Sequence, residues 1–170
     1  MTSLLLSALF GFVFQQPALA QTPPATLQPV KVLSLHNGQQ LLIELNGQGR
    51  TLRLACLQAP RSVQQPYAND AAQALADRVS RGDHATFELR SRDVYGRLVG
   101  RLIVEGRDLG ADLVRRGAVF AWDGFLGRCD DLKYSDLQQL SRQERRGVWS
   151  IPGGLQRPWD VIETHPGEEP

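Results

Sequence analysis

The chain has 170 residues, of which 42% are hydrophobic and 22% are charged, which excludes an intrinsically disordered chain and fits a single folded domain. Its net charge of +1 hides an uneven distribution, because residues 31–159 carry 19 basic and 14 acidic side chains, an excess of +5 that permits an anionic partner. Seventeen of the basic residues are arginine, whose planar fork binds phosphate in a bidentate manner, although a codon preference for arginine explains the same count.

An apolar run from Leu4 to Phe14 lies near the start of the chain and is too short to span a bilayer comfortably. The small residues up to Ala20 that follow it are typical of a signal-peptidase site. We therefore expect a signal peptide at residues 1–20, export to the periplasm or the extracellular space, and no membrane span after cleavage. The first residues lack the usual basic side chain, so an uncleaved amino-terminal anchor is the alternative.

A proline-rich linker at residues 21–29 precedes a body that we assign to residues 30–151. Three strands are expected first, at residues 30–35, 39–45 and 50–57. The Asn-Gly pairs at 37–38 and 46–47 are typical of tight hairpins, so these strands form a meander.

The other expected elements follow in the order helix, strand, strand, helix, helix. They are expected within residues 65–82, 84–92, 97–106, 107–117 and 132–146. Asp108 is the expected cap of the fourth of these elements. The order predicts an α+β, mainly β fold, a five-stranded Greek-key barrel of the oligonucleotide/oligosaccharide-binding (OB) type with three helices.

Residues 152–170 form an acidic tail rich in proline and glycine, for which we expect disorder. Trp159 is the tail residue that we expect to pack back on the body. An alternative is that the acidic side chains of the tail fold over a basic face of the body and screen it.

Cys56 and Cys129 are the two cysteines of the chain, and their spacing does not resemble a zinc site. Outside the cytoplasm, a disulfide between them is the simplest use, and closing so long a loop stabilises a fold by about 3 to 4 kcal/mol. Two unpaired buried thiols are the alternative.

Five stretches of the body together resemble the staphylococcal nuclease-like (thermonuclease) family. They are VKVLSLHNGQQLLI, LRLACLQAP, QPYANDA, DVYGRLVGRLIVEGRDLGADLVRRGAVFAW and RQERRGVW. They occur in the family's order and spacing and cover roughly residues 30–150. The resemblance implies a calcium-dependent phosphodiesterase that cleaves DNA and RNA on an OB barrel. In that family, carboxylates hold the metal, a glutamate activates water and two arginines hold the phosphate.

The resemblance transfers to this chain only in part. Arg53 and Arg97 stand at the two phosphate-binding arginine positions, whereas Gln39 and Gln58 stand at two metal-binding aspartate positions and Arg61 replaces the catalytic glutamate. The family's three carboxylates and two arginines sum to −1, and the corresponding residues here sum to +3. Glutamine carbonyls without anionic neighbours should bind calcium poorly, and an arginine does not act as a base near neutral pH. We therefore expect no metal, no cofactor and little hydrolysis by the family mechanism, with calcium required only if the enzyme is active.

Each arginine also has a structural interpretation. Arg97 braces the turn in which it lies, and Arg53 pairs with Glu44 or Asp93 across strands. Arg61 is then a solvated surface charge.

The remaining candidates have similar alternatives. Gln39 and Gln58 are hydrogen-bonding fillers of a former metal site. His36 is either a substitute base or an exposed turn residue. Three aromatic residues are expected to pack between barrel and helices rather than to stack on nucleobases, namely Phe120, Trp122 and Trp149.

The sequence supports three functions. The first is an exported, catalytically degenerate domain, a monomer, that binds nucleic acid or another phosphate-bearing polyanion through its arginines. The second is an active secreted calcium-dependent nuclease. The third is an interaction module for a protein or a component of the cell envelope.

Overall fold

The computed structural model describes residues 26–122 and 129–164. The expected signal peptide, most of the expected linker and the last six residues of the tail lie outside the described residues. Among the described residues, no helix is both long and apolar enough to cross a membrane.

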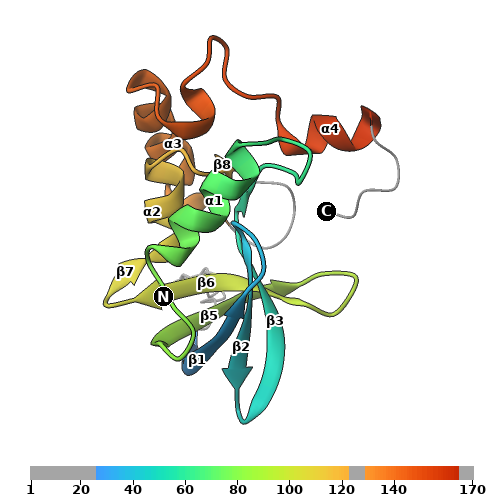
Figure 1. Ribbon diagram of the computed structural model, residues 1–170. Helices are drawn as coiled ribbons and strands as arrows, with labels where there is room; N and C mark the ends of the chain where they lie inside the picture. Colours follow the sequence, from blue (N-terminus) through green and yellow to red (C-terminus); the bar gives the residue numbers. More distant parts are fainter. Residues whose placement is uncertain (1–25, 123–128, 165–170) are drawn as a thin grey trace, which may run out of the picture.

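Five strands form a closed barrel (Figure 1), as the sequence predicts. They are β1 (Leu27–Leu35), β2 (Gln40–Leu45), β3 (Gln48–Leu54), β5 (His84–Arg92) and β6 (Leu98–Val104). Neighbouring strands pair in the order β3-β2-β1-β5-β6 and run antiparallel. The barrel closes where β3 pairs in parallel with β6, so that Arg53 lies beside Val99. This closure abolishes the open sheet edge and places the end of β3 beside the start of β6.

The strands alternate between core and solvent along their length. In β1, for example, Val30 and Val32 are buried while Lys31 between them is exposed. Such alternation buries one face of each strand inside the barrel, which is why short stretches of this sequence predict its strands correctly.

The first strand begins at Leu27, inside the stretch that the sequence assigns to a linker. Leu27 and Pro29 pair with β5, whereas the pairs between β1 and β2 begin only at Lys31. Proline lacks a backbone N–H, but here the strand has a neighbour on only one side, so the missing donor disrupts no ladder between two strands.

Four α-helices are present among the described residues, one more than the sequence predicts. They are α1 (Tyr67–Ala76), α2 (Leu109–Arg115), α3 (Tyr134–Gln143) and α4 (Pro158–Thr164). The Asp108 carboxylate caps α2, as expected, because it accepts hydrogen bonds from the backbone N–H groups of Gly110 and Ala111. Helix α4 lies in the tail for which disorder was expected, so that expectation is wrong for this segment.

The remaining elements are short. They are the strands β4 (Leu57–Gln58), β7 (Arg107–Asp108) and β8 (Phe120–Ala121), and the 3₁₀ helices η1 (Asp130–Leu132) and η2 (Gly147–Trp149). Strands β4 and β8 form a separate two-stranded sheet. These elements connect the barrel to the helices, which gather at one end of it, with α4 apart from α1, α2 and α3 (Figure 1).

The first hairpin packs directly on α1. A Cβ atom at Gly38 would lie 2.5 Å from the Cβ of Ala71, so the close approach requires glycine at this position. The Asn37 side chain accepts hydrogen bonds from the backbone N–H groups of Gln39 and Gln40, which fixes the turn. Gln39 is thus held at a defined place at the end of the barrel.

Cys56 and Cys129 form a disulfide, so the prediction of a bridge is confirmed and the alternative of two unpaired thiols is wrong. Their Cα atoms are 5.6 Å apart, a normal separation for a bridge. Cys56 lies between β3 and β4, and the bridge joins this junction to the chain that precedes η1.

Candidate functional site

Arg53 lies at the centre of the candidate site, on β3 between β2 and β6. Its side chain is buried, with 5% of the residue exposed, and its guanidinium lies over the Trp122 ring, 5.8 Å from the ring centre. The burial lowers the pKa of Arg53, and the positive charges of Arg97 and Arg61 lower it further, while the charge of Asp93 opposes them. The charges of Arg97 and Arg61 thus both act on Arg53, and the strand partner of Arg53 in β6 is Val99, two residues after Arg97.

Arg97 braces the turn between β5 and β6. Its Nε donates to Asp93 Oδ2 at 2.6 Å, and its backbone N–H donates to Asp93 Oδ1 at 2.9 Å. Burial alone would raise the pKa of Asp93, but these bonds and the charge of Arg97 hold that pKa below its usual range. The guanidinium also lies over the ring of Tyr95, at 5.0 Å. The Arg97 side chain remains 19% exposed, so it can contact both the turn and solvent.

Arg61 is buried, with 6% of the residue exposed, so the interpretation as a solvated surface charge is wrong. Its Nε donates to the backbone carbonyl of Pro158 at 3.2 Å, and its backbone N–H donates to Gln64 Oε1 at 2.9 Å. The reason for the burial is that α4 and the chain before it cover this side chain, which sequence patterns near Arg61 do not reveal.

Gln39 and Gln58 complete the site on the other side of Arg53. The side-chain oxygen of Gln39 accepts a hydrogen bond from the backbone N–H of Ala59 at 2.8 Å. Gln58 pairs with Phe120 in the short sheet of β4 and β8, and it is 3% exposed. By the roles that the family resemblance implies for these positions, we call Arg53 and Arg97 the phosphate half of the site, and Gln39, Gln58 and Arg61 the former metal half.

Arg53 does not pair with Glu44 across the strands. The neighbour of Arg53 in β2 is Gln40, and Glu44 lies opposite Gly49, farther along the same pair of strands. No ion pair of Arg53 with either suggested partner is present among the described residues, although Asp93 is near enough to raise its pKa.

Calcium, the metal that the family resemblance implies, does not fit these residues. A hard divalent cation prefers anionic oxygen ligands, whereas the former metal half offers two neutral amides and an arginine. The Gln39 oxygen is already an acceptor for Ala59, and Asp93 is bonded to Arg97. Within residues 26–122 and 129–164, no three His, Cys, Asp or Glu side chains form a group able to hold a metal ion.

His36 lies in the first hairpin and is exposed. Its backbone N–H donates to the carbonyl of Gln40. The position thus fits an exposed turn residue.

The aromatic residues divide into two groups. Phe120 and Trp149 pack edge to face in a second small core, with ring centres 5.2 Å apart, as expected for packing residues. Trp122 is only half-buried and stacks on Trp159 of α4, with ring centres 6.3 Å apart and planes at 26°. The expectation that Trp159 packs back on the body is thus confirmed, although the sequence did not indicate Trp122 as its partner.

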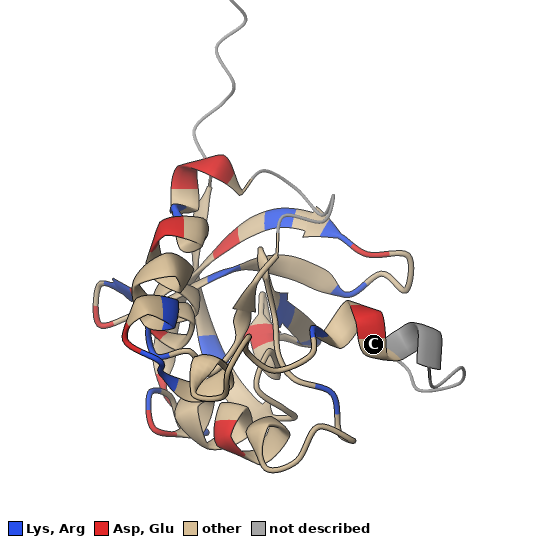
Figure 2. Cartoon of the chain, turned by 90° about the horizontal axis from the view of Figure 1, so that it is seen from above, with Lys and Arg blue, Asp and Glu red and all other residues tan. Residues whose placement is uncertain are grey.

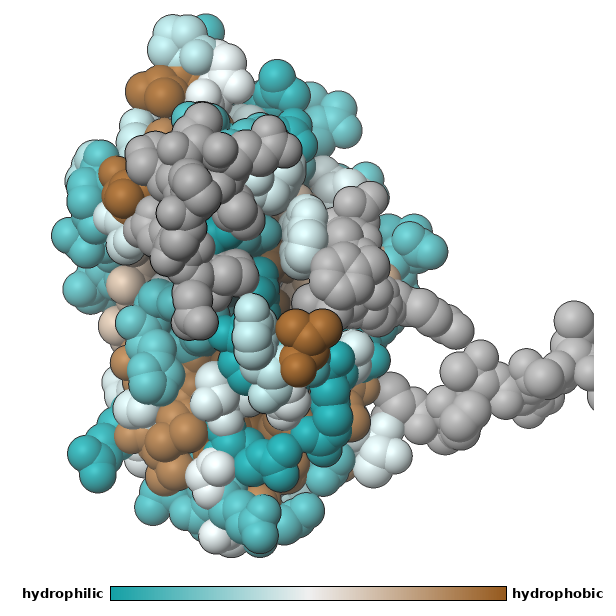
Figure 3. Space-filling view, turned by 90° about the vertical axis from the view of Figure 1, so that its right-hand side faces the viewer, coloured by the Kyte–Doolittle hydropathy of each residue, from teal (hydrophilic) through white to brown (hydrophobic). Residues whose placement is uncertain are grey.

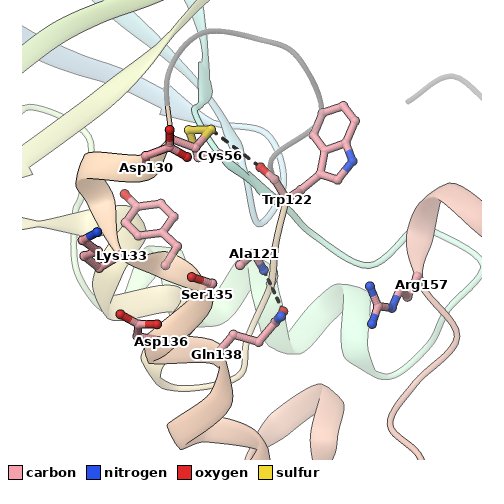
Figure 4. Close-up of a pocket in the computed structure, with 11 residues that line it drawn as sticks. Cys56, Ala121, Trp122, Asp130, Lys133, Ser135, Asp136, Gln138 and Arg157 are labelled. Atoms are coloured by element: carbon pink, nitrogen blue, oxygen red, sulfur yellow. Dashed lines mark hydrogen bonds between the residues drawn. A yellow bond between two sulfur atoms is a disulfide. The ribbon is translucent and has the colours of Figure 1, made fainter.

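A separate hollow of about 540 Å³ adjoins the site at Trp122 (Figure 4). Its walls include Asp130, Lys133, Asp136 and Arg157, so it presents both signs of charge rather than converging arginines. Gln138 on α3 accepts a hydrogen bond from the backbone N–H of Ala121 at 2.9 Å, which ties this wall to β8. The hollow therefore lacks the arginine grouping that marks the candidate site.

Charged residues of both signs are interspersed over the described part of the chain (Figure 2). On the face shown in Figure 3, hydrophobic residues form separate patches among hydrophilic ones. Two of the most exposed apolar residues, Val94 and Tyr95, lie in the turn that Arg97 braces, at 91% and 66% exposed. The arginine site, by which we mean Arg53, Arg61 and Arg97, thus stands out by its local grouping of charge and not by a large basic surface.

Comparison with known proteins decides the family. A model of the family described as "Staphylococcal nuclease homologue" matches residues 51–151, from β3 through η2. The chain belongs to the staphylococcal nuclease family. The match includes Arg53, Gln58, Arg61 and Arg97 but not Gln39.

Relatives agree with this membership. Protein ParB of Escherichia coli is 30% identical over 138 residues, which cover 76% of this chain and 76% of ParB. The protein named "Probable endonuclease LCL3" is 27% identical over 134 residues in Debaryomyces hansenii and 28% identical over 135 residues in Candida tropicalis. In both cases the match covers 72% of this chain and 57% of the fungal protein, so the chain spans little more than half the length of these relatives. The chain is thus a staphylococcal nuclease-like domain on an OB barrel.

Proposed function

We propose that this staphylococcal nuclease-like domain is exported and binds nucleic acid or another phosphate-bearing polyanion without hydrolysing it by the family mechanism. The observation that carries the proposal is that buried Arg53 lies beside the start of β6, next to Arg97, and feels the charge of Arg61, while Gln39 and Gln58 supply no carboxylate. Three arginines and the nearby Asp93 leave a surplus of two positive charges. Such a surplus in a poorly hydrated site favours phosphate oxygens.

The phosphate half supports binding because its geometry is held in advance. Asp93 fixes the Arg97 guanidinium, and the Trp122 ring lies under that of Arg53. Arginines that are already oriented lose less conformational entropy when they bind a phosphate.

The former metal half argues against hydrolysis. Arg61 does not accept a proton near neutral pH, and the loss of a general base typically costs about 10²- to 10⁴-fold in rate. Without a divalent cation, stabilisation of charge on the phosphate and activation of water are lost as well. Because both losses act on the same step, the proposal is binding without turnover.

Export is supported by the signal-like residues 1–20, and the disulfide suits an oxidising compartment. These two features fit export to the periplasm and export to the extracellular space equally well.

Binding is tested by fluorescence anisotropy with a short labelled single-stranded DNA. The matched control is Arg107→Ala, because Arg107 is exposed and lies on β7, at the opposite end of β6 from Arg97. We expect Arg97→Ala to weaken binding by about 10-fold or more, Arg107→Ala by less than about 2-fold, and affinity of the parent to fall steeply with salt. Equal losses in the two variants, with circular dichroism showing both folded, would contradict the arginine site.

An active calcium-dependent nuclease is the second candidate, and the endonuclease names of the LCL3 relatives favour it. Digestion of the same DNA with calcium and with a chelator separates the two. Calcium-dependent cleavage that disappears in Arg97→Ala would establish the second candidate. If DNA, RNA and inorganic phosphate all fail to bind at low salt, the remaining function is an interaction module for a protein or envelope component.

A further inference from the structure

The C-terminal segment of residues 155–161, which we call the cover, packs against Arg61 and against Trp122, whose ring lies on Arg53. Two backbone carbonyls of the cover accept hydrogen bonds from side chains of the loop that precedes α1. Pro158 O accepts from Arg61 Nε at 3.2 Å, and Gln156 O accepts from Gln64 Nε2 at 2.7 Å. The segment therefore presents one carbonyl oxygen to Arg61, which the family resemblance places at the catalytic glutamate position, and a second to its neighbour Gln64.

The cover also contributes an aromatic ring to a stack in which two indole rings lie between two guanidinium groups. The Trp159 ring stacks on Trp122, which also lies against the guanidinium of Arg53. The guanidinium of Arg157 lies over Trp159 at 5.4 Å, and Phe120 meets the same ring edge to face at 6.0 Å. The indole of Trp159 thus lies against the half-buried ring next to Arg53.

The cover contacts Arg61 directly through Pro158, and it contacts Arg53 only by way of the Trp122 ring that lies between them. Arg53 and Arg61 are only 5% and 6% exposed. A ligand as large as a polynucleotide needs these groups to be accessible. The cover ends in α4, which has only seven residues. A helix of that length is not stable without tertiary contacts, so the cover depends on its contacts with the rest of the protein. It is attached by the two carbonyl bonds, by the stacking of Trp159 and by the buried side chains of Pro158 and Val161.

We propose that the cover is a displaceable internal ligand of the arginine site. It offers the site an aromatic ring, next to Trp122, and a carbonyl oxygen, on Arg61, in place of the base and phosphate of a nucleic acid, and the polyanion binds after the cover has moved away. This inference rests on the proposed function, because it names how access to that site is regulated. In this scheme the measured association constant equals that of the open site multiplied by the fraction of molecules in which the cover has moved away.

The first test is Trp159→Ala in the full chain, with Gln156→Ala as its matched control. The Gln156 side chain belongs to an exposed residue, and the contact to Gln64 uses its backbone oxygen, so this substitution leaves the cover attached. Loss of the stack should tighten binding of the labelled single-stranded DNA by about 3- to 10-fold, and Gln156→Ala should change it by less than about 2-fold.

A second measurement needs no variant. The backbone N–H groups of Asp160 and Val161 donate to the carbonyl of Arg157. The rate of hydrogen exchange in a peptide that contains them therefore reports whether the first turn of α4 is formed. Addition of the DNA to the parent should speed exchange of this peptide, while exchange in the barrel strand β2 should not rise.

The outcomes separate this inference from the proposed function. If the DNA binds in an Arg97-dependent manner but Trp159→Ala does not tighten binding and exchange of the peptide slows or stays the same, the cover does not regulate access and the inference is wrong. If Trp159→Ala speeds exchange of the peptide without DNA, and neither it nor the parent binds the DNA, the proposed function fails and the inference fails with it. Tighter binding in Trp159→Ala together with faster exchange in the DNA-bound parent supports both.

Discussion

Arg97 in the phosphate half and Gln39 in the former metal half each hold a neighbouring loop through a side-chain hydrogen bond, but they differ in charge. Arg97 forms an ion pair with Asp93 and remains 19% exposed. Gln39 is 4% exposed and accepts a hydrogen bond from Ala59 through a neutral amide. One half therefore retains a charged group that reaches solvent, and the other retains only an internal contact.

The difference shows what the fold itself needs at the position of Gln39. A backbone N–H requires an oxygen acceptor, and an amide oxygen satisfies it as well as a carboxylate does. A divalent cation, in contrast, requires negative charge. Gln39 therefore preserves the hydrogen bond to the loop after β4 while the electrostatic condition for calcium is absent.

The largest effect is expected where the two halves join. Cys56 lies between Arg53 and Gln58 in the chain, and its disulfide closes a span of 73 residues. Replacement of Cys56 and Cys129 by serine should lower the free energy of unfolding by about 3 to 4 kcal/mol. Urea unfolding of the parent and the double variant measures the loss, and an unchanged midpoint would show that the junction is held without the bridge.

A smaller loss is expected in the former metal half. Gln39→Ala leaves the buried N–H of Ala59 without its acceptor, which should cost about 1 to 3 kcal/mol of unfolding free energy. Gln48→Ala, at an exposed position of β3, is the control and should cost less than about 0.5 kcal/mol. Equal losses by urea unfolding would mean that the Gln39 bond adds nothing to the stability of the site.

The smallest effect depends on pH and belongs to the phosphate half. Because Arg97 lowers the pKa of Asp93 in the folded protein, this carboxylate adds stability above its ordinary value of 3.8 and loses that contribution as the pH falls below it. Asp93→Asn should therefore be less stable than the parent near pH 6, and the difference should shrink as the pH falls below the ordinary aspartate value. Urea unfolding of both proteins across this pH range measures the difference in stability. A difference that grows as the pH falls would contradict the prediction.

Sequence alone predicted the parts of the fold that depend on local patterns. The alternation in β1, the Asn-Gly hairpins and the Asp108 cap all involve residues within a few positions of one another. The bridge between Cys56 and Cys129 followed from the count of cysteines and the expected compartment.

The burial of Arg61 could not be predicted in this way, because its partner Pro158 lies 97 positions away. The acidic, proline-rich composition around Pro158 indicated disorder, whereas contacts with Arg61, Gln64 and Trp122 hold α4 in place. The two-residue strands β4 and β8 are likewise too short to leave a periodic pattern. The candidate arginines were therefore named from the sequence, but the contact of Arg61 with Pro158 was not.

The central claim is that the site has exchanged affinity for a divalent cation for affinity for an anion. Calorimetric titration of calcium into the chain without residues 1–20 tests this most directly, with the triple variant Gln39→Asp, Gln58→Asp, Arg61→Glu titrated alongside. We expect no binding heat from the parent and measurable binding by the variant. Stoichiometric calcium binding by the parent, at an affinity equal to that of the variant, would contradict the account.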